Sequence, residues 1–222
     1  MRPLKVTALL LDGRVASVDG RLSLDSILAY SWMLENYPEQ VYLNVAATDK
    51  RIDPDLSGAL EKRGEGDNWF WACSLGQFRQ TRESIEYLHK RINPMAAERY
   101  VDFKGRRGKV ITAGGPYKSW RKPIVVKLIP AVAWYCVGDA DEIRGLLSHI
   151  THIGSRRGAG YGLVREWRVE PWAEDWSVYG PEGRLMRAIP DPGGTETHAI
   201  RPPYWSPRNW RTCRVPEVAR RA

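Results

Sequence analysis

Apolar residues recur along this chain with the two periods that distinguish strands from helices. The run Leu4–Leu11 is short and almost wholly apolar, which predicts a first strand that is largely buried. The dipeptides Asp12-Gly13 and Asp19-Gly20 follow it as turn signals. The chain is therefore expected to open with a core strand and a turn region.

A helix is predicted next, because apolar positions now repeat three or four residues apart. Its expected apolar face consists of Leu24, Ile27, Leu28, Ser31 and Leu34. Either Ser23 or Asp25 is able to cap the first turn, and Tyr37-Pro38 is expected to end the helix.

The middle of the chain alternates polar and aromatic stretches. Residues 44–66 are rich in Asp, Gly, Lys and Arg and predict a surface excursion. Asn68–Leu75 predicts an aromatic strand, and Thr81–Arg91 predicts a short helix. Pro123–Val137 is the most hydrophobic stretch, so it is expected to form the central strand or strands, with Pro130 at a bend or edge.

A second helix is predicted from Asp139, an N-cap with an acid at Glu142, to Gly154 as its C′ residue. Its expected apolar face is Ile143, Leu146, Leu147, Ile150 and Ile153. Leu163–Val169 then predicts a strand. The whole order predicts an α+β fold of the ferredoxin-like, or RRM-like, split β-α-β type.

The stretch Gly154–Gly162, between that helix and strand, holds four glycines and two arginines. Successive exposed backbone N–H groups in such a loop form an anion-binding concavity, and guanidinium groups bind phosphate bidentately. The loop runs from helix to strand, whereas nucleotide-binding loops run from strand to helix, so no nucleotide cofactor is expected. It is either a loop that touches a phosphate backbone or a glycine-rich turn without a ligand.

Charge supports a polyanionic partner. The 222 residues carry a formal net charge of +8 and form either one large domain or two small ones. Cys73, Cys136 and Cys213 form neither a zinc motif nor a disulfide framework, which favours a reducing, cytoplasmic location. We expect no signal peptide, no membrane span and no cofactor.

The excess charge is concentrated in residues 99–122, where eight basic residues stand against Asp102. The basic residues are Arg99, Lys104, Arg106, Arg107, Lys109, Lys118, Arg121 and Lys122. The strand-like pieces Arg99–Phe103 and Lys109–Thr112 predict a hairpin. With Tyr117 and Trp120 as stacking rings, it would grip single-stranded nucleic acid. The alternative is a solvated loop.

The composition changes after residue 170, where Pro, Gly, Trp and Arg become frequent. Residues 1–170 are expected to form the main domain, with the basic hairpin inserted at about 99–122. Residues 171–222 are expected to form an irregular C-terminal appendage packed on it, with a hairpin in Trp176–Arg187 around Gly180–Gly183.

Three stretches carry a family resemblance. The pattern Ile-Gly-x-x-Arg-x-x-Gly-x-Gly at 153–162 resembles the glycine-rich loop of the RAMP superfamily of CRISPR proteins. Ser23–Tyr30 and Arg201–Trp205 resemble the third Csf subunit family of type IV CRISPR systems, which is of the Cas-five type. The resemblance covers most of the chain.

The resemblance implies a non-catalytic crRNA-binding subunit of an effector ribonucleoprotein that acts in antiviral and plasmid defence. Such a subunit holds the 5′ handle of the guide RNA, caps a filament of Cas-seven-type backbone RAMP subunits, and uses the basic hairpin as a thumb that kinks the RNA. A large-subunit-like protein is a further partner, and contact with target DNA near the protospacer-adjacent motif is left open. The expected RNA-binding residues are Gly154, Ser155, Arg156, Arg157, Gly158, Gly160, Tyr161, Gly162, Lys104, Arg106, Arg107, Lys109, Tyr117, Lys118 and Trp120.

Three alternatives are weighed against this function. A metal-independent pre-crRNA endoribonuclease of the RAMP class needs a general base and acid, and Tyr117, Lys118 and His149 are candidates, while the first helix offers only Tyr30. His149 and His152 lack a third metal ligand nearby in sequence, so no metal site is expected. A general single-stranded RNA-binding protein, or a DNA-binding protein or RNA chaperone, also fits a basic, aromatic-rich surface.

Overall fold

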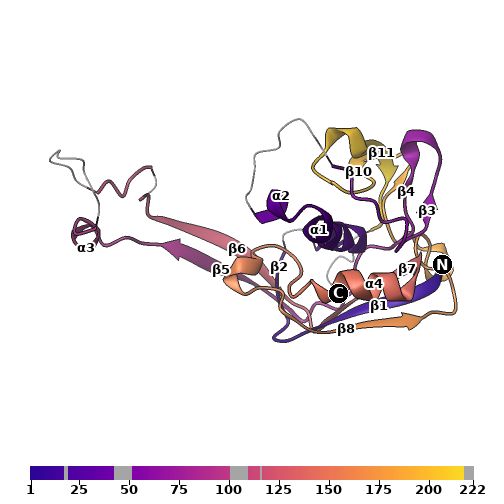
Figure 1. The fold of residues 1–222 in the computed structure, drawn as a ribbon, viewed down its shortest axis with the longest axis horizontal. Coiled ribbons are helices and arrows are strands. Elements are labelled where there is room, and N and C mark those ends of the chain that lie inside the picture. Colours follow the sequence, from indigo (N-terminus) through magenta and orange to yellow (C-terminus); the bar gives the residue numbers. More distant parts are fainter. Residues whose placement is uncertain (18–19, 43–51, 101–109, 116, 218–222) are drawn as a thin grey trace.

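The structure, a computed structural model, describes residues 1–17, 20–42, 52–100, 110–115 and 117–217. It is an α+β protein whose sheets are mostly antiparallel. Figure 1 shows a body that contains the sheets and main helices, and a long arm that extends from one side of it.

The body is built on a sheet with strand order β7-β1-β8. The first strand, β1 (Arg2–Leu10), lies in the middle and pairs antiparallel with β7 (Ala131–Gly138) and with β8 (Val164–Pro171). Alternate residues of β1 are buried, so one face of the strand supplies the core. The predicted first strand is confirmed.

The segment after β4 (Phe70–Trp71) continues this sheet beyond β7. Isolated antiparallel bridges join Cys73 to Cys136 and Gln77 to Ala133. The prediction of a strand at Asn68–Leu75 is therefore met by a short strand and separate bridges rather than by one long strand. A two-residue strand, β3 (Lys62–Arg63), pairs with β4, and the 3₁₀ turn η1 (Gly66–Asn68) connects them.

Two helices, α1 (Leu24–Asn36) and α4 (Ala140–Ser148), pack together over the sheet (Figure 1). The Ser31 hydroxyl donates a hydrogen bond to the carbonyl of Leu146 and joins them. The core between helices and sheet includes Leu4, Val6, Leu24, Leu28, Trp134, Ile143 and Leu147, all within 1% of full burial. A short helix, α2 (Pro38–Tyr42), follows α1 directly.

The capping of α4 follows the sequence, but its length does not. Asp139 accepts hydrogen bonds from the backbone N–H groups of Asp141 and Glu142, as predicted for an N-cap. The helix ends at Ser148 with His149 as C-cap, so the prediction that Gly154 is the C′ residue is wrong. Ile150 and Ile153 are still buried, because the chain beyond the helix stays against the core.

Six elements of the body follow one another as β1, α1, the bridged segment after β4, β7, α4 and β8. This order of strands and helices is compatible with a ferredoxin-like fold. In such a fold the first strand lies between the last two strands and is antiparallel to both. The positions of β1, β7 and β8 meet this condition.

The arm is a hairpin of β5 (Arg82–Lys90) and β6 (Trp120–Leu128), with β2 (Arg14–Ala16) paired to the inner end of β6. The prediction of a helix at Thr81–Arg91 is wrong, because this segment alternates in burial along an antiparallel strand. Pro130 separates β6 from β7, so the predicted bend within Pro123–Val137 is confirmed.

The outer end of the arm carries α3 (Pro94–Ala97), capped by the Asn93 side chain. Of the hairpin strand predicted at Arg99–Phe103, Arg99 and Tyr100 form a turn and the rest lies outside the described residues. Val110–Thr112, the described part of the second predicted strand, is not a strand. The hairpin therefore starts closer to the body than predicted.

The C-terminal region is more regular than the predicted appendage. Strands β9 (Ile189–Pro190), β10 (Glu196–Ala199) and β11 (Trp210–Arg214) form a sheet with β11 in the middle. The 3₁₀ turn η4 (Pro207–Asn209) directly precedes β11 in the chain. Its own apolar cluster includes Phe70, Val178, Ile200 and Cys213.

The hairpin predicted around Gly180–Gly183 is confirmed. A bridge joins Tyr179 to Leu185, and the 3₁₀ turn η3 (Pro181–Gly183) closes it. The surface excursion predicted at 44–66 is wrong in its second half, where Leu56, Ala59 and Leu60 are 1–3% exposed and belong to the main core. Residues 43–51 lie outside the described part of the chain.

All three cysteines are buried and carry free thiols. Burial raises the pKa of Cys73 well above its ordinary value and that of Cys136 to about 12. None of the helices in the described part of the chain has the length and apolar character needed to cross a bilayer.

Candidate nucleic-acid interface

The glycine-rich loop, residues 154–162, is fastened to the body at both ends. Ser155 donates its backbone N–H and its hydroxyl to the carbonyl of Ala16, at 3.0 and 2.7 Å, and Gly162 donates its N–H to the carbonyl of Arg14 at 2.7 Å. Both acceptors lie on β2, which pairs with the arm. The loop is therefore held at the junction of arm and body.

Two of the four glycines are required by this packing. Gly162 has φ +75°, and a Cβ there would lie 1.9 Å from the carbonyl oxygen of Ile153. Gly154 has φ +78°, and its Cβ would lie 2.9 Å from the Val15 side chain. Neither position accepts a side chain without a shift of the backbone.

The outer half of the loop faces solvent. Arg156, Arg157, Gly158 and Gly160 are all exposed, and a Cβ at Gly158 or Gly160 would meet nothing within 4 Å. Arg156 is in the left-handed region at φ 57°, which a non-glycine residue seldom adopts. The predicted loop therefore consists of an anchored frame and an open segment with two exposed guanidinium groups.

Arg157 connects this open segment to the first helix. Its guanidinium carbon lies 4.2 Å from the ring centroid of Tyr30 on α1, a cation–π contact. Both residues line a groove of about 540 Å³ between the loop, β2 and the start of α1. We call it the loop groove. The other lining residues are Ala16, Ser17, Arg21, Leu22, Ser23, Ser26, Ile27, Ile150, His152, Ile153, Gly154 and Ser155.

Tyr161 faces the protein rather than the solvent. Its ring is 6% exposed, and its hydroxyl donates a 2.6 Å hydrogen bond to the Glu86 carboxylate on β5. This hydrogen bond is the main cause that raises the pKa of Tyr161. The side chain thus ties the loop to the arm, and only the backbone of Tyr161 is left for the predicted RNA contact.

The other predicted contact residues fall between β5 and β6 in the sequence or at the start of β6. The four basic residues Lys104, Arg106, Arg107 and Lys109 lie outside the described residues. Tyr117 and Lys118 are exposed just before β6, and Trp120 opens that strand, half-buried, with the Lys122 ammonium 5.1 Å from its ring centroid. The structure thus places these three residues at the outer end of β6, whereas the glycine-rich loop is anchored to β2, which pairs with the inner end of β6 (Figure 1).

The two faces of the arm differ. Cross-strand partners share a face, and the pairs Ile85–Val125, Tyr87–Pro123 and His89–Arg121 lie on one of them. On this face Ile85 and Tyr87 are 61% and 45% exposed, and the Arg121 guanidinium lies 3.6 Å from the Tyr87 ring centroid. The other face packs Leu88, Ile124 and Val126 against Tyr161.

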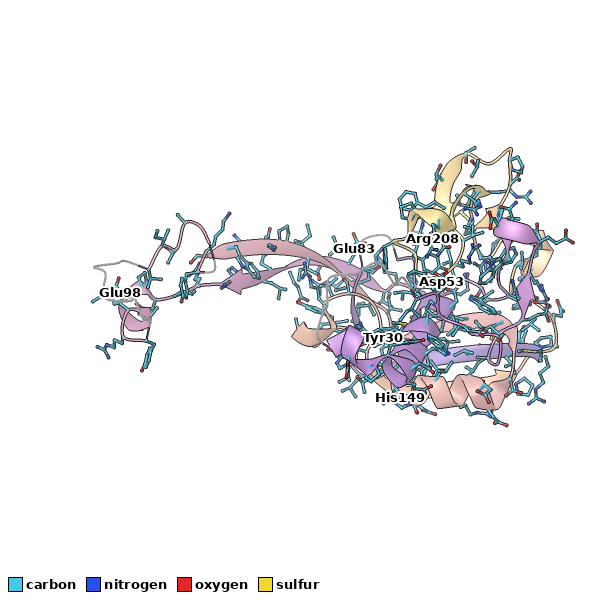
Figure 2. The ribbon with its side chains drawn as sticks, turned by 45° about the horizontal axis from the view of Figure 1, so that its top comes forward. Tyr30, Asp53, Glu83, Glu98, His149 and Arg208 are labelled. Carbon is cyan, nitrogen blue, oxygen red and sulfur yellow. The ribbon has the colours of Figure 1, made fainter. Side chains whose placement is uncertain are left out.

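The residues considered for catalysis are not brought together. Figure 2 labels His149 and Tyr30 on the body, whereas Tyr117 and Lys118 directly precede the outer end of β6. The His149 ring lies 3.0 Å from the Glu35 carboxylate, between α4 and α1. His152 is bridged to Leu163. Within the described ranges no group of three metal-ligating side chains is close enough to hold an ion.

One buried cluster was not anticipated from the sequence. Asp25, on α1, is fully buried and accepts hydrogen bonds from the Tyr204 hydroxyl at 2.8 Å and from the Ser23 hydroxyl. Arg187 lies 3.8 Å from the same carboxylate. The signal was present in an indirect form, because Ser23–Tyr30 and Arg201–Trp205, two stretches that carry the family resemblance, contact each other here.

Fold and site together define an α+β protein with a glycine-rich, arginine-bearing loop beside a groove and a long hairpin arm. Residues 2–216 match the family model for the CRISPR type IV associated protein Csf3, and the chain belongs to this family. The resemblance to type IV CRISPR proteins is thereby confirmed. No curated protein matches the chain.

Proposed function

We propose that this chain is the non-catalytic crRNA-binding subunit of a type IV CRISPR effector ribonucleoprotein. It holds the 5′ handle of the guide RNA and caps the filament of Cas-seven-type backbone subunits. The observation that carries the proposal is the open half of the glycine-rich loop, where Arg156, Arg157 and bare backbone lie beside a groove of about 540 Å³. Membership of the Csf3 family supports it.

The proposal includes the architecture. The body is a ferredoxin-like RAMP domain, and the arm is its thumb. The support for this is the central position of β1 between β7 and β8, together with a hairpin inserted between the two halves of the β-α-β pattern. The arm projects from the junction at which the loop is anchored, so both can touch one strand of RNA (Figure 1).

The RNA is bound as a single strand. The grooves of an A-form duplex are poorly accessible to side chains, whereas unstacked bases present both faces and edges. Arg156 and Arg157 contact phosphate, and the backbone of residues 158–160 approaches the strand closely because no side chains intervene. Tyr117 and Trp120 supply stacking surfaces on the arm.

The wider assembly belongs to the same proposal. The partners are backbone RAMP subunits of the Cas-seven type and a large-subunit-like protein, in the cytoplasm. Contact with target DNA near the protospacer-adjacent motif is compatible with the exposed arginines of the C-terminal region, among them Arg208 in η4 and Arg214 on β11.

The test measures binding of a labelled handle RNA by fluorescence anisotropy. We expect Arg156→Ala with Arg157→Ala to weaken binding by about 3 kcal/mol, since charge-assisted hydrogen bonds to phosphate are lost. Arg2→Ala with Arg165→Ala removes the same charge from exposed positions on β1 and β8 and serves as the matched control. Equal affinities for the two double variants would remove the loop from the RNA interface.

The competing function is a metal-independent pre-crRNA endoribonuclease. Incubating the protein with labelled precursor RNA in the presence of a chelator distinguishes the two functions. We expect the precursor to remain intact and bound. Release of a product with a defined 5′ handle would overturn the non-catalytic part of the proposal.

A further inference from the structure

A second pocket lies at the seam between the start of α1 and the C-terminal sheet. Its volume is about 520 Å³, within the range of about 300–1,000 Å³ typical of small-ligand sites. We call it the seam pocket. Its lining includes Arg21, Asp25, Arg187, Thr197, Tyr204 and Trp210.

The buried charge at the floor of the seam pocket is compensated. The Asp25 carboxylate receives the Tyr204 hydroxyl at 2.8 Å, and Arg187 lies on its other side at 3.8 Å. Arg187 also donates to the carbonyl oxygens of Cys73, at 3.0 Å, and Ile200, at 2.7 Å. A buried carboxylate with this many partners does not repel an anionic ligand as a free one would.

The seam pocket lies beside the loop groove. Arg21, Ser23 and Ser26 line both cavities, so the first turn of α1 and the residue before it form their common edge. Arg21 is held there by Glu196, at 3.6 Å, and by the His198 ring. A strand of RNA that contacts Arg157 and follows the loop groove would meet the guanidinium group of Arg21 where the groove borders the seam pocket.

The chemistry of the walls matches a nucleobase. The Trp210 side chain is 48% exposed, and its indole N–H donates to the carbonyl oxygen of Tyr204 at 3.0 Å, which fixes the ring. Leu75, Ala188 and Val215 add apolar surface, while the hydroxyl groups of Ser26 and Thr197 are the kind of group that reads the edge of a base. A flat ligand with apolar faces and polar edges fits both properties.

We propose that the seam pocket takes one unstacked base of the bound single-stranded RNA, with the base against Trp210 and its phosphate at Arg21. This site rests on the proposed function and adds to it, because it brings the C-terminal sheet into the RNA interface. The loop groove and the seam pocket then receive successive nucleotides of one strand, joined across Arg21.

The test uses a set of handle RNAs in which one nucleotide at a time is replaced by an abasic ribose. Because Trp210→Ala removes the aromatic face on which the base stacks, it is expected to weaken binding of the intact handle roughly tenfold. At one position the abasic RNA and Trp210→Ala together should weaken binding no more than either change alone. At every other position the two effects should multiply.

Two variants separate the base contact from an effect on folding. Trp210→Phe keeps an aromatic face without the N–H group and should bind the intact handle within about threefold of wild type. Trp205→Ala removes a neighbouring tryptophan that is 62% exposed and does not line the seam pocket, so it should bind as wild type does.

The failure of this site and the failure of the proposed function give different results. If Trp210→Ala binds every RNA of the set as wild type does, while Arg156→Ala with Arg157→Ala loses binding, the seam pocket does not hold a base and the proposed function stands. If the affinity loss caused by Trp210→Ala multiplies with the loss at every abasic position, the seam pocket is likewise excluded as a binding site for a base. If the wild-type chain does not bind the handle at all, the proposed function fails first.

Discussion

The Tyr204 hydroxyl lies 2.8 Å from both carboxylate oxygens of Asp25, across a sequence separation of 179 residues. Burial is the main cause that raises the pKa of Tyr204 well above its ordinary value, and the charge of Asp25 adds to it. The phenol therefore remains a donor at any physiological pH. This contact joins the first helix to the C-terminal region at the floor of the seam pocket.

We expect Tyr204→Phe to lower the free energy of unfolding by about 1–3 kcal/mol, since a buried carboxylate loses a donor. Urea denaturation followed by tryptophan fluorescence measures the change. Tyr179→Phe is the matched control, because Tyr179 is 45% exposed and its hydroxyl accepts from Arg214 at the surface. Equal free energies of unfolding for the two variants would show that the hydrogen bond from Tyr204 to Asp25 does not stabilise the fold.

The glycines of the loop should divide into structural and functional positions. Gly162→Ala places a Cβ against the Ile153 carbonyl at positive φ and should cost about 2–4 kcal/mol of stability. Gly158→Ala meets nothing within 4 Å and should leave the melting temperature unchanged while it weakens RNA binding. Thermal unfolding and anisotropy on both variants check this. A stable Gly162→Ala protein would contradict the packing of the loop.

The basic residues of the stretch 104–109 should determine the salt dependence of RNA binding. Replacing Lys104, Arg106, Arg107 and Lys109 by Ala should reduce the slope of log K against log salt by about 3, at about 0.7 per phosphate contact. Anisotropy titrations between low and high salt give the slope. Arg2→Ala with Arg165→Ala should leave it unchanged. If the fourfold variant keeps the wild-type slope, these residues are solvated and contact no RNA.

Alkaline pH should destabilise the protein. Burial raises the folded-state pKa of Cys73, Cys136 and Tyr204, so each holds its proton more tightly when folded, and its contribution is complete below the unfolded pKa and lost as pH rises. For Cys136, which rises from 9.0 to about 12, the loss by pH 10.5 is about 2 kcal/mol.

Urea denaturation at pH 7 and pH 10.5 measures this loss. Cys136→Ala should show a smaller decrease between the two pH values than wild type, because one of the titrating thiols is absent. A wild-type protein that is equally stable at both values would refute the assignment of buried, neutral thiols.

Much of the fold could be predicted where the apolar pattern has a single period. The strands at 2–10 and 164–171 and both main helices follow from periodicity, turn signals and caps. Thr81–Arg91 was predicted as a short helix with Ile85 and Leu88 as its apolar residues. In the arm they lie on opposite faces of a strand, which only the pairing with β6 determines.

The site was predictable in its composition but not in its geometry. The arginines and glycines of the loop could be identified from the sequence as candidate contact residues. The inward position of Tyr161 could not, because it involves a hydrogen bond to Glu86, a residue 75 positions away. The seam pocket could not be foreseen, because its walls come from residues 21–26, 73–75, 187–188 and 197–216. No local pattern records that these segments meet.

The central position of β1 has a consequence for synthesis of the chain on the ribosome. This strand leaves the exit tunnel before both of its neighbours in the sheet, residues 131–138 and 164–171. Until those segments emerge, both edges of the strand and the side chains of Leu4, Val6 and Ala8 have no native cover. The body therefore assembles late, and slowing translation after residue 138 should extend the interval in which chaperones bind the nascent N-terminus.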